Sequence, residues 1–108
     1  MLNLPKWNIT ELTGYVPQTT FWSDFSIADR FGANAIVDTY NRAFNEWKND
    51  VIYLTELVMV LNHKCWSFYN QNKNDLSQLY SSLYYKAHEW ALDNLKGEDL
   101  EYYIRTTD

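Results

Sequence analysis

The sequence predicts an all-α fold, a small antiparallel bundle of three to four helices around a central helix at about 50–70. Three observations support this prediction. Between Val51 and Phe68 the chain is apolar on almost every side of a helical wheel. In other segments apolar residues recur at spacings of three and four. The 108 residues include only three Gly and two Pro, too few for many short strands joined by turns. We expect one domain over 1–108.

The predicted central helix carries three apolar lines along its length. The first line holds Val51, Leu54, Val58, Leu61, Cys65 and Phe68. The second holds Ile52, Met59 and Trp66, and the third holds Tyr53, Leu57 and Val60. The remaining polar sector consists of Glu56, His63 and Ser67. A helix that is apolar almost all round must be covered on several sides, so we expect the other helices to surround it.

The first 18 residues predict an irregular arm. Pro5, Gly14 and Pro17 disfavour a regular helix there. The segment is nevertheless too apolar for a free tail, so we expect it to wrap the bundle, with Trp7 as its anchor.

A first helix is predicted near 20–31. Thr19 or Thr20 is a suitable N-cap, because a side-chain oxygen there can accept a hydrogen bond from the opening turn. One face of the helix carries apolar residues at helical spacing, namely Phe21, Phe25, Ala28 and Phe31. Gly32 is predicted to end the helix as a left-handed cap.

Two helices are predicted at 34–48 and 50–70, although their apolar pattern runs on without a break. The stripe of the first one holds Ile36, Tyr40, Phe44 and Trp47. One continuous helix over 34–70 is the alternative, but it would be about 55 Å long, too long for a compact chain of this size. Asn49 and Asp50 are poor helix formers and good caps, which favours two helices.

A further helix is predicted at 75–96, with Asp75 as N-cap and Gly97 at its end. Its core stripe holds Leu76, Leu79, Tyr80, Leu83, Ala87 and Trp90. After it, a short C-terminal turn or helix is predicted at 98–104, where Leu100, Tyr103 and Ile104 can fold back on the bundle.

A second stripe on this helix, formed by Tyr85, His88 and Leu92, lies away from the core stripe. It needs a cover, which the N-terminal arm, the C-terminal tail or another subunit could supply. We therefore predict these three residues as partner-binding and a homodimer as one form of that partnership, because Tyr and Trp are enriched where proteins bind each other.

The formal charge of −5, from nine basic and fourteen acidic residues, disfavours direct binding to nucleic acid, which needs clustered Lys and Arg. Mild acidity that keeps the protein soluble is one interpretation, and an acidic surface that meets a basic protein is another. No signal peptide is evident, and no apolar run is long enough to span a bilayer. We expect a cytoplasmic protein without membrane contact.

No motif predicts catalysis, a metal or a cofactor. His63 and Cys65 lie about 200° apart on a helix, so they cannot share one metal ion or form a dyad within that helix. The Glu-x-x-His pair of helical di-iron proteins is absent, and three scattered Gly cannot cradle a phosphate. Cys65 lies in the apolar run and predicts a small core residue. We expect no enzyme.

Three stretches carry a resemblance: TTFWSDFSIADRFG at 19–32, YLTELVMVLNHKCW at 53–66 and NLKGEDLEYYIRTTD at 94–108. Together they resemble a small uncharacterised family of similar length encoded on phage-like and conjugative mobile elements of gut bacteria. The resemblance spans about residue 15 to the end and implies a cytoplasmic accessory protein of a mobile element. It brings no activity and no binding residue with it.

Three functional hypotheses follow. The first is a non-enzymatic protein–protein interaction module that uses surplus aromatic surface. The second is an acidic inhibitor, a nucleic-acid mimic that acts on a DNA- or RNA-binding protein and presents its carboxylates in one ribbon. The third is an enzyme or metal-dependent switch that uses His63, His88 and Glu56. The first, with self-association as its expected form, is favoured because the stripe of Tyr85, His88 and Leu92 and the central helix both need cover, and no catalytic motif is present.

Overall fold

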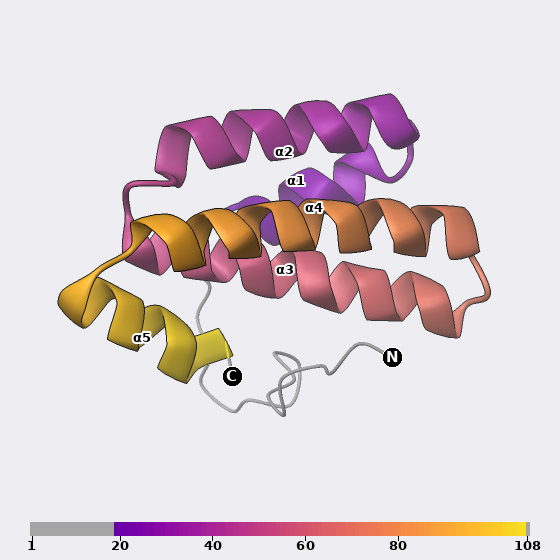
Figure 1. Ribbon diagram of the computed structural model, residues 1–108. Helices are drawn as coiled ribbons and strands as arrows, with labels where there is room; N and C mark the ends of the chain where they lie inside the picture. Colours follow the sequence, from indigo (N-terminus) through magenta and orange to yellow (C-terminus); the bar gives the residue numbers. More distant parts are fainter. Residues whose placement is uncertain (1–18, 108) are drawn as a thin grey trace.

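The computed structural model describes residues 19–107, which form five helices and no strand (Figure 1). The helices are α1 (Phe21–Ala28), α2 (Ala33–Trp47), α3 (Val51–Asn70), α4 (Asn74–Asn94) and α5 (Gly97–Thr107). The predicted all-α bundle is confirmed, and the C-terminal segment predicted as a turn or helix is the helix α5. The expectation of a wrapped arm at 1–18 lies outside the described residues.

Helix α3 is the centre of the bundle, and each of the other four helices packs against it. From Leu54 to Asn62 every residue of α3 is buried, on all sides of the helix. Buried apolar side chains from all five helices meet in one core around it. Helix α4 runs back along α3 after a short turn (Figure 1). The prediction of a central helix covered by its neighbours is therefore confirmed.

A break separates α2 from α3, as the two-helix prediction requires. The Asp50 side chain caps α3 by accepting hydrogen bonds from the amides of Ile52 at 3.1 Å and Tyr53 at 3.2 Å. The longest dimension of the molecule is 38 Å, too short for a continuous rod over 34–70. That alternative is wrong because α2 ends at Trp47 and the turn at 48–50 reverses the chain before α3 begins.

Helix α1 is shorter than predicted and ends at Ala28. The buried face formed by Phe21 and Phe25 is confirmed, but Phe31 is 76% exposed, so its assignment to that face was wrong. The helical spacing stops applying once the chain turns after Ala28. Gly32 does not cap α1; it precedes α2 with φ +102° and ψ −172°, a conformation that glycine adopts readily.

The start of α1 is fixed by Thr19. Its hydroxyl oxygen accepts a hydrogen bond from the amide of Phe21 at 3.2 Å. Thr20 occupies the N-cap position, but its hydroxyl donates to the Asp24 carboxylate at 2.9 Å. Of the two predicted caps, Thr19 is therefore the one whose side chain binds the opening turn.

The boundaries of α4 and α5 also differ from the prediction. Helix α4 begins at Asn74, so Asp75 lies in its first turn and is not the N-cap. It ends at Asn94, and Gly97, with φ +60°, begins α5. Helix α5 covers Gly97–Thr107, longer than the predicted 98–104; Tyr103 is fully buried against the bundle, and in the added last turn the Thr107 hydroxyl donates to the Tyr103 carbonyl at 2.7 Å.

Candidate functional site

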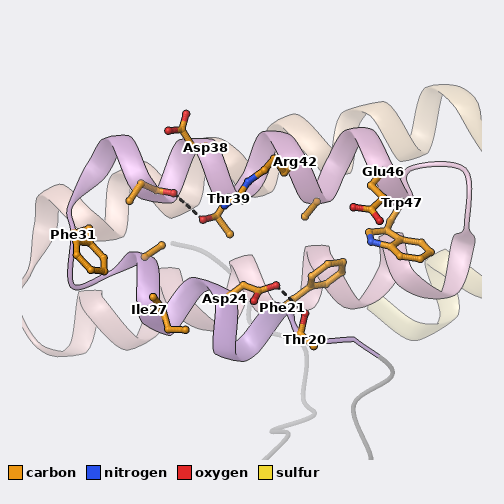
Figure 2. A pocket seen from close by; sticks show the side chains of 13 residues that line it. Thr20, Phe21, Asp24, Ile27, Phe31, Asp38, Thr39, Arg42, Glu46 and Trp47 are labelled. Atoms are coloured by element: carbon orange, nitrogen blue, oxygen red, sulfur yellow. Dashed lines mark hydrogen bonds between the residues drawn. The ribbon is translucent and has the colours of Figure 1, made fainter.

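A groove of about 580 Å³ lies between α1 and α2 (Figure 2). Its buried lining residues are Phe21, Ala28, Thr39 and Ala43. Three of these four side chains are small, which leaves space between the two helices. The Thr39 hydroxyl donates to the carbonyl of Ala35 at 2.8 Å, so a hydrogen bond within α2 already satisfies this hydroxyl. The base of this α1/α2 groove therefore offers mainly apolar contact.

Two large apolar side chains stand exposed at one end of the α1/α2 groove. Phe31 is 76% exposed and Ile27 is 56% exposed, and both line the groove. Figure 2 shows them where α1 turns into α2, with Trp47 at the opposite end. Phe31 is the most exposed of the large apolar side chains between residues 19 and 107. An aromatic residue held open beside a groove is a typical anchor of a protein interface.

Exposed charges border the α1/α2 groove. Asp24, Asp38 and Glu46 are acidic and Arg42 is basic, so the residues that line the groove include three carboxylates and one guanidinium. Arg42 lies four residues from each of the two acidic residues on α2. Over residues 19–107, Lys64 and Asp29 form the only ion pair, so Arg42 neutralises neither neighbour at close range. The border of the groove is therefore negatively charged.

Helix α5 covers one residue of the predicted stripe on α4 and leaves the other two exposed. His88 is covered: its Nδ1 lies 2.6 Å from the phenol oxygen of Tyr103, and its ring stacks on Tyr84 with centroids 5.5 Å apart. Burial lowers the pKa of His88. Tyr85 and Leu92 are each 46% exposed. The C-terminal segment thus supplies part of the cover, and the partner-binding role of the three residues stays a prediction.

Tyr85 also borders a second groove, of about 490 Å³, between α3 and α4. Its aromatic lining residues are Trp66, Tyr69 and Tyr85, and we call it the aromatic groove. None of its lining residues is charged. Cys65 lies against it, buried, with its sulfur 3.6 Å from the Ser77 hydroxyl, and burial raises the pKa of the thiol. Cys65 is therefore a core residue, as predicted.

The three residues of the switch hypothesis contact different parts of the chain. The His63 ring packs on Trp22 of α1 with centroids 4.8 Å apart, and burial lowers its pKa. His88 contacts Tyr103 of α5, while the Glu56 carboxylate accepts a hydrogen bond from the Thr19 amide at 3.1 Å. Within residues 19–107, no three His, Cys, Asp or Glu side chains gather closely enough to hold a metal ion.

Sequence reasoning missed the α1/α2 groove. The signal was present in part, because Ala28, Ala35 and Ala43 place small side chains on two consecutive helices. Their convergence depends on the turn at residues 29–32, which also exposes Phe31. Periodicity within one helix carries no information on that turn.

No protein-family model, no curated protein and no solved structure matches this chain. None of the helices described between residues 19 and 107 combines the length and hydrophobicity needed to cross a bilayer.

Proposed function

We propose that this protein is a non-enzymatic protein–protein interaction module whose docking surface is the α1/α2 groove. The observation that carries the proposal is the exposure of Phe31 and Ile27 beside a groove with an apolar base. Single exposed apolar residues are ordinary on protein surfaces. Two of them at the mouth of one groove, surrounded by charged residues, have the composition of an interface with an apolar centre and a polar rim.

The contribution of Phe31 to folding supports the same interpretation. With three-quarters of its surface in water, Phe31 gains little of the burial energy that places aromatic residues in cores. Covering it would remove apolar area from water, and a partner protein can provide that cover. The resemblance to proteins of mobile elements adds the proposal that the module is an accessory protein of such an element.

The alternative of a nucleic-acid mimic receives less support from the placement of the carboxylates. Asp24, Asp38 and Glu46 border the α1/α2 groove. A separate set lies at the end of α4 and on α5, namely Asp93, Glu98, Asp99 and Glu101. Asp29 is already paired with Lys64. A mimic needs one ribbon of free carboxylates, and two groups on different helices are a poor match to it.

Site-specific photo-crosslinking in the native host tests the proposal. A photoreactive phenylalanine at position 31 should yield discrete adducts with another protein, and the same probe at position 104 is the matched control. Ile104 is also an exposed apolar residue, 46% exposed, but it lies on α5. Replacing Ala35 by Trp, which fills the groove, should abolish the adducts. No adduct from position 31, or adducts that persist in the filled groove, would overturn the proposal.

A further inference from the structure

We propose that the α1/α2 groove binds an amphipathic helix of a partner protein, one that carries Lys or Arg beside its apolar stripe. This inference rests on the proposed function and specifies the partner. It follows from two properties of the groove, the helical structure of both its walls and the sign of the charges along its border.

The walls of the groove favour a helix over an extended strand. A strand binds by adding to the edge of a sheet, where free backbone N–H and C=O groups remain. Both walls are α-helices, whose backbone groups are bonded internally along their length. Recognition must therefore use side chains, and an amphipathic helix presents these at regular intervals of three and four residues.

The length of the groove suits such a helix. Helix α2 has 15 residues, which corresponds to about 22 Å. The lining residues extend from Phe31 at one end to Trp47 at the other (Figure 2). A partner helix of about four turns can place one apolar residue against Phe31 and others along the base formed by Ala28 and Ala43.

The charges select the partner. Asp24, Asp38 and Glu46 create a negative border that attracts Lys and Arg. A second copy of this chain, with a net charge of −5 and the same acidic border, meets repulsion at this surface. Arg42 lies between two of these carboxylates on α2 and offsets part of their negative charge, so its removal should favour a basic partner.

Three synthetic peptides of about 15 residues, added to the full-length chain, test the inference. The first is an amphipathic helix with Leu on one face and Lys and Arg on the other. The second replaces its basic residues by Glu, and the third has the composition of the first in scrambled order. Fluorescence anisotropy should show saturable micromolar binding of the first peptide that weakens with added salt. The other two should bind about tenfold more weakly or not at all.

Variants of exposed residues locate the binding in the groove. Phe31→Ala should weaken binding of the basic peptide by about tenfold, as expected for an aromatic anchor. Asp24→Lys should weaken it and Arg42→Glu should tighten it, each by about two- to fivefold. Ile104→Ala and Glu101→Lys, which change α5, are matched controls that should leave the affinity unchanged. Circular dichroism of each variant checks that the helices are retained.

Several outcomes would overturn the inference. Equal binding of the acidic and basic peptides would show that charge does not select the partner, and insensitivity to Phe31→Ala would place binding elsewhere. A dimer broken by Phe31→Asp in sedimentation would identify a second copy as the occupant. A photo-adduct within the same chain at residues 1–18 would identify that segment instead. None of these outcomes is the one that overturns the proposed function. That outcome is the absence of groove-dependent photo-adducts with another protein.

Discussion

His88 and Tyr103 lie 2.6 Å apart, imidazole Nδ1 to phenol oxygen, and this hydrogen bond fastens α5 to α4. The two rings are also in contact, with centroids 5.7 Å apart. Burial raises the pKa of Tyr103 and lowers that of His88, so both groups are neutral near neutral pH. A neutral hydrogen bond from the C-terminal helix therefore covers part of His88 from within the chain, and its partner-binding role stays a prediction.

Replacing Tyr103 by Phe should destabilise the protein. The change keeps the buried ring and removes the hydroxyl, which leaves the His88 nitrogen without its partner. The free energy of unfolding should fall by about 1–2 kcal/mol. Urea denaturation followed by circular dichroism measures the change. Tyr102→Phe is the matched control, because Tyr102 is only partly buried, and it should leave the urea midpoint unchanged.

Replacing Tyr40 by Phe should have the opposite effect. Tyr40 is buried in the same core, but its hydroxyl has no hydrogen-bond partner in the described part of the chain. Burial also raises its pKa to about 12. Removing an unpaired buried hydroxyl avoids its desolvation cost, so Tyr40→Phe should raise the free energy of unfolding by about 1 kcal/mol. A decrease comparable to that of Tyr103→Phe would show that the Tyr40 hydroxyl has a partner.

The end of α1 depends on Asp29. Its carboxylate accepts hydrogen bonds from Lys64 of α3, at 2.8 Å, and from the Tyr80 hydroxyl of α4. The Lys64 and Asp29 side chains are only 13% and 15% exposed, so solvent screens the pair incompletely. Asp29→Ala should cost about 2–3 kcal/mol of unfolding free energy, because it leaves the Tyr80 phenol without its acceptor and the Lys64 ammonium with the Ser26 hydroxyl in place of a carboxylate.

Two further variants check this assignment. Asp24→Ala removes an exposed carboxylate from the same helix and should cost less than about 1 kcal/mol. In a double-mutant cycle, Asp29→Ala and Tyr80→Phe should cost less together than the sum of their separate effects, because they share one hydrogen bond. Additive effects would show that the two side chains are not coupled.

Both histidines should make the fold less stable in mild acid. Burial lowers the pKa of His63, with Lys64 beside it contributing, and burial lowers that of His88 although Glu89 opposes it. Protons then bind the unfolded chain more readily than the folded one. The stability that the two neutral histidines contribute is fully present at a pH above 6.5, their ordinary pKa. It is lost as the pH falls from there toward the lowered pKa values of the folded state.

Urea midpoints measured between about pH 7.5 and about pH 5 test this dependence. The wild-type midpoint should fall over this interval, and the double variant His63→Gln, His88→Gln should show a shallower fall. The carboxylates are unchanged in the double variant and so act as an internal reference. Equal slopes for the two proteins would contradict a role of the histidines.

Most of the helices could be predicted from the sequence, because the spacing of apolar residues within one segment is enough to indicate a helix there. The apolar wheel at residues 51–68 and the cap at Asp50 predicted α3 correctly. Helix ends were less accurate, because they depend on contacts between segments. Helix α5 is held against α4 through Tyr103, whose partner His88 lies 15 residues away in the sequence. The α1/α2 groove has the same origin, since it exists only where the turn at 29–32 sets α1 against α2.

Phe25 and Phe31 show where helical spacing predicts burial correctly and where it fails. Both were assigned to one buried face, yet Phe25 is fully buried and Phe31 is 76% exposed. Phe25→Ala should lower the free energy of unfolding by about 3–5 kcal/mol, because it leaves a cavity beside Tyr80, whose ring centroid lies 5.8 Å away. Phe31→Ala should change it by less than about 0.5 kcal/mol. A large loss of stability in Phe31→Ala would mean that this side chain serves the fold, and the α1/α2 groove would then lose its anchor for a partner.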